Sequence, residues 1–309
     1  MENLHLFAFA DEADDCFDGQ IKALKANGLE GPELRNLDGV SVADLSDQKA
    51  HEIRRKLDAQ GLRVWSVGSP IGKIDIEKGN FAVHTQKFLR VLEIAKILGA
   101  ENIRIFSFFI PEDKNPDDYE EEVLRRLNLF ASLATPFGIT LCHENEKGIY
   151  GSTPERCQKI HQAIPAIPAI FDPANYIQCG VETAQAWAII KPYVKYLHIK
   201  DALADGRVVE PGLGVGHVPE ILHEYLEMGG TYLTVEPHLA LFDSLKGLEK
   251  DGIRSAVGDK TYASKEAAFA AAVEALRSLI QKEGRARKSA RSFSHCGISA
   301  KPPRACRNR

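Results

Sequence analysis

Apolar runs and amphipathic stretches alternate eight times along the chain, and this repetition limits the possible fold more than any other feature. Several runs are apolar almost throughout, which is typical of strands that are covered on both faces. Each is followed by a stretch with apolar residues at helical spacing. We therefore predict eight strand–helix units. The predicted strands are 4–10, 32–35, 62–69, 103–109, 139–144, 166–172, 193–201 and 231–236. The predicted helices are 20–28, 47–61, 81–99, 116–138, one that begins after Ser152 or Thr153, 181–190, 218–229 and 265–284.

Eight such units are most simply arranged as a (β/α)8 TIM barrel of the α/β class, formed by residues 1–283 as a single domain. A doubly wound open sheet is the alternative, and it would bind ligands at a reversal of strand order. No GxGxxG motif follows the first predicted strand, so we favour the barrel. The loops predicted after the seventh and eighth strands, 201–217 and 237–264, are long, and such loops build the active-site face of a barrel.

The last part of the chain, 284–309, differs from the rest in charge. It holds eight of the 39 Lys and Arg residues and none of the 43 Asp and Glu residues. It has no apolar period, so we predict a disordered basic tail. A nucleic-acid-binding arm and a non-native extension are the alternatives. The remaining body is acidic, which does not suit a nucleic-acid-binding protein.

The composition is that of a globular protein, with 44% hydrophobic and 27% charged residues. No apolar stretch is long enough to cross a bilayer, and the acidic N-terminus is a poor signal peptide. We expect a cytoplasmic protein without membrane contact. Its six cysteines show no CxxC pair, so we expect reduced and mostly structural thiols.

Residues of metal-ligand type stand at or near the ends of the last four predicted strands. They are Glu144, Asp172, His198 and Glu236. The C-terminal ends of parallel barrel strands meet at one face, so these residues are predicted to converge. Carboxylates with one imidazole form a hard, mixed oxygen and nitrogen site for a divalent ion.

Each of these residues also has a simpler interpretation. The glutamates could be strand-end carboxylates bonded to loop amides, and Asp172 could form an Asx turn before Pro173. His198 alone could be a hydrogen-bonded core residue. The joint occurrence of all four at successive strand ends favours the metal site.

Further polar residues accompany these four in the sequence. Lys200 shares a strand face with His198 and would steady an oxyanion or an anionic substituent. Glu146, Asn175 and His238 are predicted substrate contacts.

Glu33 and Arg35, at the end of the second predicted strand, would bind the far end of the substrate or form an ion pair on the barrel rim.

The chain resembles the sugar phosphate isomerase/epimerase family of xylose-isomerase-like barrels over residues 4–282. The segments that carry the resemblance are FADEADD (9–15), PELRNLDG (32–39), HENEKGIYG (143–151), FDPANYIQCG (171–180), YLHIKDA (196–202), PGLGVGHVP (211–219) and VEPHL (235–239). The resemblance implies that Glu144, Asp172, His198 and Glu236 bind one divalent ion, with Mn²⁺ first and Mg²⁺, Co²⁺ or Zn²⁺ as alternatives.

One departure from the family concerns Asn175, which stands where ketose epimerases of this family have a histidine. The related apurinic endonucleases need additional histidine ligands, so the resemblance does not extend to them.

The resemblance implies a sugar or sugar phosphate isomerase or epimerase that removes a proton beside a carbonyl by way of an enediolate. Glu144 and Glu236 would be the acid–base pair, with Lys200 beside them. The alternatives are a dehydratase of an inosose-like or dehydroshikimate-like ketone and a non-catalytic sugar-binding barrel.

The expected partner is a small carbohydrate, with a homo-oligomer possible. Two glycine-rich segments, GSPIGK (68–73) and GLGVG (212–216), could hold a phosphate, although neither matches a P-loop.

Overall fold

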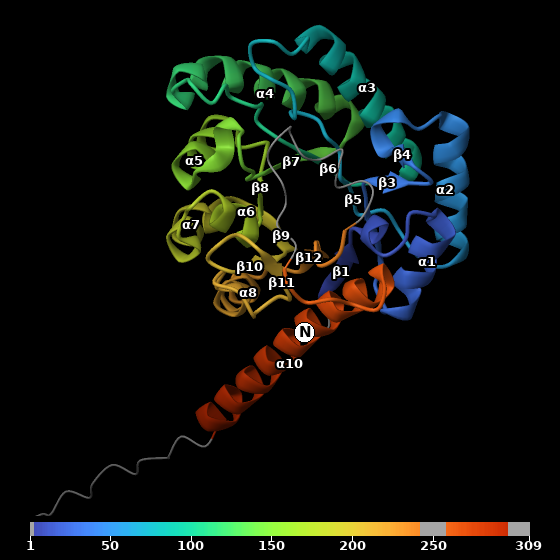
Figure 1. Ribbon diagram of the computed structural model, residues 1–309, viewed down its shortest axis with the longest axis vertical. Helices are drawn as coiled ribbons and strands as arrows, with labels where there is room; N and C mark the ends of the chain where they lie inside the picture. The colour runs from blue at the N-terminus through green and yellow to red at the C-terminus, as the bar shows by residue number, and fades with distance from the viewer. Residues whose placement is uncertain (1–2, 242–257, 296–309) are drawn as a thin grey trace, which may run out of the picture.

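The computed structural model describes residues 3–241 and 258–295. Eight parallel strands close into a barrel, and helices surround it (Figure 1). The barrel strands are β1 (His5–Ala8), β2 (Gly31–Leu34), β5 (Ser66–Val67), β6 (Asn102–Ile105), β7 (Thr140–Glu144), β8 (Ala169–Phe171), β9 (Val194–Ile199) and β12 (Tyr232–Val235). The prediction of a TIM barrel is confirmed, and the open-sheet alternative is excluded because β1 pairs with both β2 and β12.

The helices lie outside the strands. They match the predicted helices with small shifts at their ends, except for the short helix Pro173–Gln178, which was not predicted, and the C-terminal helix, which is longer than predicted. They are α1 (Phe17–Ala26), α2 (Asp47–Ala59), α3 (Phe81–Leu98), α4 (Glu120–Ala134), α5 (Pro154–Ala163), α6 (Pro173–Gln178), α7 (Thr183–Ile190), α8 (Val218–Glu227) and α10 (Lys265–His295). Local chemistry fixes several boundaries. Thr153 caps α5 with Pro154 in its first turn, and Gly99 ends α3 in the left-handed region at φ 72°.

Two short hairpins extend the C-terminal ends of barrel strands. β3 (Asn36–Leu37) pairs with β4 (Val40–Ser41), and β10 (Asp201–Ala202) pairs with β11 (Val208–Val209). The second hairpin lies in the long loop predicted after the seventh strand. Much of the loop predicted after the eighth strand, 242–257, lies outside the described residues.

Two clusters of buried apolar residues stabilise the barrel. The larger one lies between strands and helices, where Phe88, Leu92 and Phe130 are fully buried. The smaller one lies inside the barrel and consists of Phe7, Trp65, Cys142, Ile170 and Tyr196. Successive residues of a strand point to opposite faces, so Glu144 and Cys142 share the inner face of β7.

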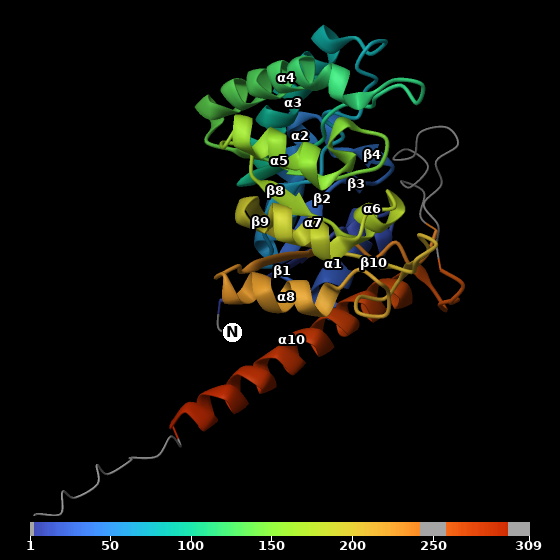
Figure 2. The ribbon, with the colours of Figure 1, turned by 90° about the vertical axis from the view of Figure 1, so that its left-hand side faces the viewer.

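The C-terminal helix differs from the prediction. We predicted disorder from residue 284, but α10 continues to His295 and projects beyond the barrel (Figures 1 and 2). Its first turns pack on the barrel through Phe269, Val273 and Leu276. The segment 285–295 is rich in alanine, arginine and lysine, which favour helix. No proline occurs between Lys265 and Pro302 to end the helix. The rest of the predicted tail, 296–309, lies outside the described residues.

No helix in the described part of the chain is long and apolar enough to span a membrane.

Candidate metal centre

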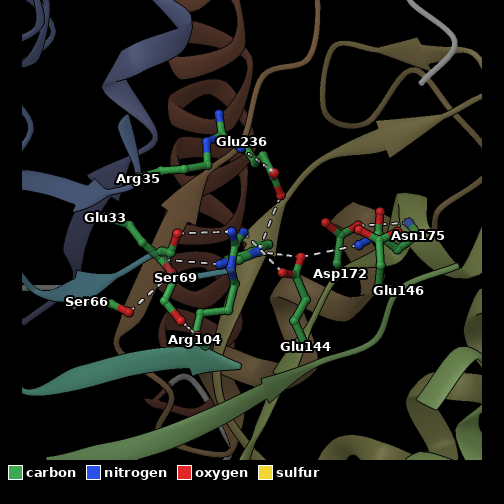
Figure 3. Close-up of polar contacts among 12 residues, drawn as sticks. Glu33, Arg35, Ser66, Ser69, Arg104, Glu144, Glu146, Asp172, Asn175 and Glu236 are labelled. Atoms are coloured by element: carbon green, nitrogen blue, oxygen red, sulfur yellow. Dashed lines mark hydrogen bonds and ion pairs between the residues drawn. The ribbon is translucent and has the colours of Figure 1, made fainter. Parts of the chain in front are cut away.

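The four predicted metal ligands converge at the C-terminal ends of adjacent strands. Glu144 ends β7, Asp172 follows β8, His198 lies in β9, and Glu236 follows β12. One ligand atom from each lies within 4.8 Å of the others. All four side chains are buried, with at most 3% of the residue exposed. Figure 3 shows the three carboxylates turned toward one another.

Glu144 uses its two oxygens differently. Its Oε1 lies 2.9 Å from His198 Nδ1 and accepts a hydrogen bond from Asn175 Nδ2 at 3.3 Å. Its Oε2 forms an ion pair with Arg104 at 3.2 Å. One oxygen therefore faces the cluster while the other is fixed by an arginine from β6.

Glu236 repeats this arrangement from the other side of His198. Its Oε2 lies 3.4 Å from His198 Nδ1 and 3.1 Å from Lys200 Nζ. Its Oε1 accepts a hydrogen bond from Arg35 at 3.2 Å. Each glutamate thus directs one oxygen inward and gives the other to an arginine.

Asp172 serves the fold and the cluster at once. Its Oδ1 caps α6 by accepting a hydrogen bond from the Asn175 amide at 2.9 Å. Its Oδ2 lies 2.9 Å from Lys200 Nζ. The capping turn expected from the sequence is present, and it leaves the second oxygen for the cluster.

His198 is oriented by a carboxylate on its far side. Its Nδ1 faces Glu144 and Glu236, whereas its Nε2 lies 3.1 Å from Glu33 Oε2. Glu33 in turn accepts hydrogen bonds from Tyr196 and Ser66 at 3.0 and 3.2 Å. A carboxylate of this kind fixes the ring and the tautomer of a ligating histidine.

The structure places Glu33 and Arg35 differently from the simplest prediction. Glu33 is buried within the barrel, with its Oε2 3.1 Å from His198 Nε2. Arg35 instead joins Asp11, Glu12 and Glu236. Glu33 and Arg35 therefore have separate buried partners, and contact of either side chain with a substrate stays a prediction.

The remaining predicted substrate contacts lie around the cluster. Asn175 Nδ2 donates to both Glu144 and the Asn145 carbonyl, so its amide group supports a ligand. Glu146 is ion-paired with Lys73 at 3.0 Å. His238 lies with Nε2 3.5 Å from both Glu12 and Glu236 and has a left-handed backbone at φ 44°. Their roles toward a substrate stay predictions.

Three supporting residues were missed by the sequence analysis. Arg104 lies between Phe9 and Phe106, with ring centroids 5.0 and 4.9 Å from its guanidinium. Asn145 exchanges two hydrogen bonds with the backbone of Asp172. Glu12 accepts from Arg35 and from the His238 amide. An arginine within the apolar run 103–109 was the one available signal.

Burial and charge shift the pKa of the central groups in opposite directions. Burial alone would lower the pKa of Lys200, but Asp172, Glu236 and Glu144 raise it above its usual value. Burial and the carboxylates Glu236 and Glu144 raise the pKa of Asp172, against the opposing effect of Lys200. Lys200 therefore keeps its proton more firmly than a free lysine, and Asp172 loses its proton less readily than a free aspartate.

Burial also raises the pKa of Glu12 to about 8, despite the opposing effect of Arg35. Burial would raise the pKa of Glu236 as well, but Lys200 and His238 hold it well below its usual range. These neighbouring glutamates therefore differ in how readily they bind a proton.

The donor set fits a divalent cation. It offers carboxylate oxygens and one imidazole nitrogen at one buried point, the chemistry preferred by hard and borderline ions. Buried carboxylates without a compensating cation are costly. His198 Nε2 also lies within hydrogen-bonding distance of Glu33. Histidines that bind a metal through one ring nitrogen usually have such a partner on the other.

Comparison with known proteins gives the same fold. The family model for the xylose isomerase-like TIM barrel matches residues 21–279. No curated protein matches the chain by sequence.

Three solved structures are similar in fold. The probable 3-DHS dehydratase AsbF from Bacillus anthracis has 14% identity and a TM-score of 0.67, covering 89% of this chain and 98% of its own. A D-tagatose 3-epimerase-like protein has 14% identity and a TM-score of 0.69, covering 91% and 99%. A xylose isomerase-like TIM barrel protein from Mycobacterium smegmatis in complex with magnesium has 16% identity and a TM-score of 0.66, covering 91% and 97%.

Proposed function

The chain belongs to the xylose isomerase-like TIM barrel family, and on that premise we propose that it is a divalent-metal-dependent isomerase or epimerase of carbohydrates. It would remove a proton from the carbon beside a carbonyl group and return it at the same or the neighbouring carbon. Structural neighbours include an epimerase-like protein and a probable dehydratase, which supports carbohydrate or related ketone chemistry on this fold.

Glu144, Asp172, His198 and Glu236 would hold the ion. A bound divalent ion polarises a carbonyl and stabilises the negative charge that develops on its oxygen. We propose Mn²⁺ first, with Mg²⁺, Co²⁺ and Zn²⁺ as alternatives, since oxygen-rich sites with one imidazole accept all of them.

The glutamate pair is the observation that carries the proposal. Glu144 and Glu236 approach from β7 and β12 and lie 2.9 and 3.4 Å from the same nitrogen of His198. Each has its second oxygen fixed by an arginine. Two positioned carboxylates on either side of a carbon are what proton removal on one face and return on the other require.

Lys200 completes the arrangement. Its Nζ lies between Asp172 and Glu236, and their charges keep it protonated. It would donate a hydrogen bond to an oxygen that becomes negative during proton removal.

Solvent-deuterium exchange into a ketose tests this proposal. Glu144→Gln and Glu236→Gln should each reduce exchange by ~10²–10⁴-fold, the usual contribution of a positioned acid or base. Glu101→Gln, an exposed glutamate before β6, is the matched control and should exchange at the wild-type rate. Circular dichroism should show that all three variants are folded. Full exchange in both site variants would contradict the proposal.

The product distinguishes epimerisation from dehydration, which begins with the same proton removal. Dehydration creates an enone that absorbs ultraviolet light, and epimerisation does not. We expect no new absorption with the exchanging ketose. A protein that binds no ion and exchanges no substrate would instead be a sugar-binding barrel.

A further inference from the structure

The positively charged side chains at the metal centre are already paired with carboxylates. Arg35 donates to Asp11, Glu12 and Glu236 at distances between 2.9 and 3.2 Å. Its side chain is only 2% exposed. A substrate anion could bind Arg35 only by displacing one of these buried partners.

The other cations of the centre are also paired with carboxylates, although the buried Nε of Arg104 has no hydrogen-bond partner in the described part of the chain. Arg104 pairs with Glu144, and Lys200 pairs with Asp172 and Glu236. Lys73 pairs with Glu146 at 3.0 Å, with the two side chains 11% and 16% exposed.

Carboxylates outnumber these cations. The connected carboxylates in the described part of the chain are Asp11, Glu12, Glu33, Glu144, Glu146, Asp172 and Glu236, and the lysines and arginines are Arg35, Lys73, Arg104 and Lys200. With Glu12 counted as neutral because burial raises its pKa to about 8, six charged carboxylates face four lysines and arginines, and a divalent ion offsets this difference without leaving a surplus of positive charge. A doubly charged phosphate would therefore enter a centre that is not positive.

Backbone amides of the glycine-rich loop 212–216 already bind an anionic side chain of the protein, that of Asp201. Asp201 Oδ2 accepts from the amides of Gly212 and Gly214 at 2.9 and 3.0 Å, and Oδ1 accepts from Gly216 at 2.9 Å. A Cβ at Gly214 or Gly216 would lie only 2.3 or 2.5 Å from Asp201 Oδ1. The glycines thus allow an internal carboxylate to fill the position that a phosphate would take.

The second glycine-rich loop, 68–73, is also satisfied internally. The Ile71 amide donates to Ser69 Oγ, and the Gly72 amide donates to His84 Nε2 at 2.8 Å. The Lys73 amide donates to the Pro70 carbonyl. Neither loop that the sequence suggested for phosphate offers these amides to a ligand.

We propose that the substrate of this centre is an uncharged polyhydroxy ketone, because the cations and glycine-rich loops around it in the described part of the chain are occupied by the protein's own carboxylates and acceptors. This inference rests on the proposed function and narrows it. It disfavours sugar phosphates and ketones that carry a carboxylate. An anionic group that displaced an internal carboxylate from Arg35 would leave that carboxylate buried and unpaired, which is strongly unfavourable.

Matched substrate pairs test the inference. With the Mn²⁺-loaded full chain, deuterium exchange is measured for D-fructose against D-fructose 6-phosphate and for D-tagatose against D-tagatose 6-phosphate. We expect the uncharged member of each exchanging pair to have the higher kcat/KM by about tenfold or more, as one lost charged hydrogen bond implies. Faster exchange of a phosphorylated member would overturn the inference.

A binding measurement decides the inference even if no ketose exchanges, which would be a failure of the proposed function alone. D-fructose 6-phosphate is titrated into the Mg²⁺-loaded protein and followed by ³¹P NMR. The Glu146→Gln variant removes the carboxylate charge that pairs with Lys73. We expect it to bind the phosphate ester about tenfold more tightly than the wild type. Saturable wild-type binding that is as tight as in this variant would overturn the inference.

Discussion

The inside of the barrel has two layers that are equally buried and opposite in polarity. The lower layer contains Cys142, Ile170 and Tyr196, and two residues further along the same strands the upper layer contains Glu144, Asp172 and His198. All six residues are at most 2% exposed. Because side chains of one strand face alternate, a step of two residues keeps the face and moves roughly 7 Å along the strand.

The comparison separates what stabilises the fold from what the site does. Burial of the apolar lower layer is favourable, whereas burial of the charged upper layer is costly unless each charge is paired. The upper layer is tolerated because ion pairs link its ligands to Arg35, Arg104 and Lys200. Changes in the lower layer should therefore affect stability, and changes in the upper layer should affect the ion.

The largest effect is expected from truncation in the lower layer. Trp65 stacks on Tyr232 with ring centroids 3.8 Å apart and contacts Phe7 and Tyr196. Trp65→Ala should reduce the free energy of unfolding by ~3–5 kcal/mol, since it leaves a large cavity. Chemical denaturation measures this loss. Metal affinity of the folded fraction should change little, and a parallel loss of metal affinity would show that the layers are not separable.

Metal binding should stabilise the protein through the upper layer alone. At a free Mn²⁺ concentration of about 100 times Kd, the gain should be ~2.7 kcal/mol. Asp172→Asn should lose most of this gain in a thermal-shift measurement. Ile170→Val, two residues before Asp172 in the sequence, should keep the gain while the protein loses ~0.5–1.5 kcal/mol of stability. Equal metal-induced shifts in the wild type and Asp172→Asn would argue against the metal centre.

Glu33 links the two layers, because it accepts from Tyr196 below and faces His198 above. Glu33→Gln should weaken metal binding by about 10–100-fold, as loss of an orienting carboxylate usually does. Competition with a chelator measures the affinity. Ser66→Ala, which removes one hydrogen bond to Glu33 and keeps the carboxylate, should have a smaller effect. If Glu33→Gln bound the metal as tightly as the wild type, Glu33 would support only the packing of the lower layer.

The smallest effect is expected at Cys142. Its thiol is buried in the lower layer, and burial raises its pKa. Cys142→Ala removes one buried atom and should cost about 1 kcal/mol of unfolding free energy. Metal affinity should equal that of the wild type. A change in affinity larger than the change in stability would place Cys142 in the metal centre.

The sequence was sufficient to predict the barrel and the convergence of Glu144, Asp172, His198 and Glu236. Period-two alternation at strand ends places Glu144 and His198 on the inner face, and closure of eight parallel strands brings them together. Both inferences depend on local patterns that a regular fold converts directly into positions.

The supporting residues could not be predicted because they depend on which side chains meet across the barrel. Glu33 reaches His198 from β2, far away in the sequence, and Arg35 reaches Asp11 and Glu236. The extent of α10 was also missed, since a basic segment without an apolar period reads as disorder although its residues favour helix.

The loop around Asp201 has a consequence for how such a barrel could change its specificity. Four amides converge on this one carboxylate, from Ala202, Gly212, Gly214 and Gly216. Replacement of Asp201 by glycine would leave those donors without an acceptor and turn the loop into a receptor for an external oxyanion. A related barrel could therefore come to bind substrates that carry an oxyanion through this one substitution, while its strands stay the same.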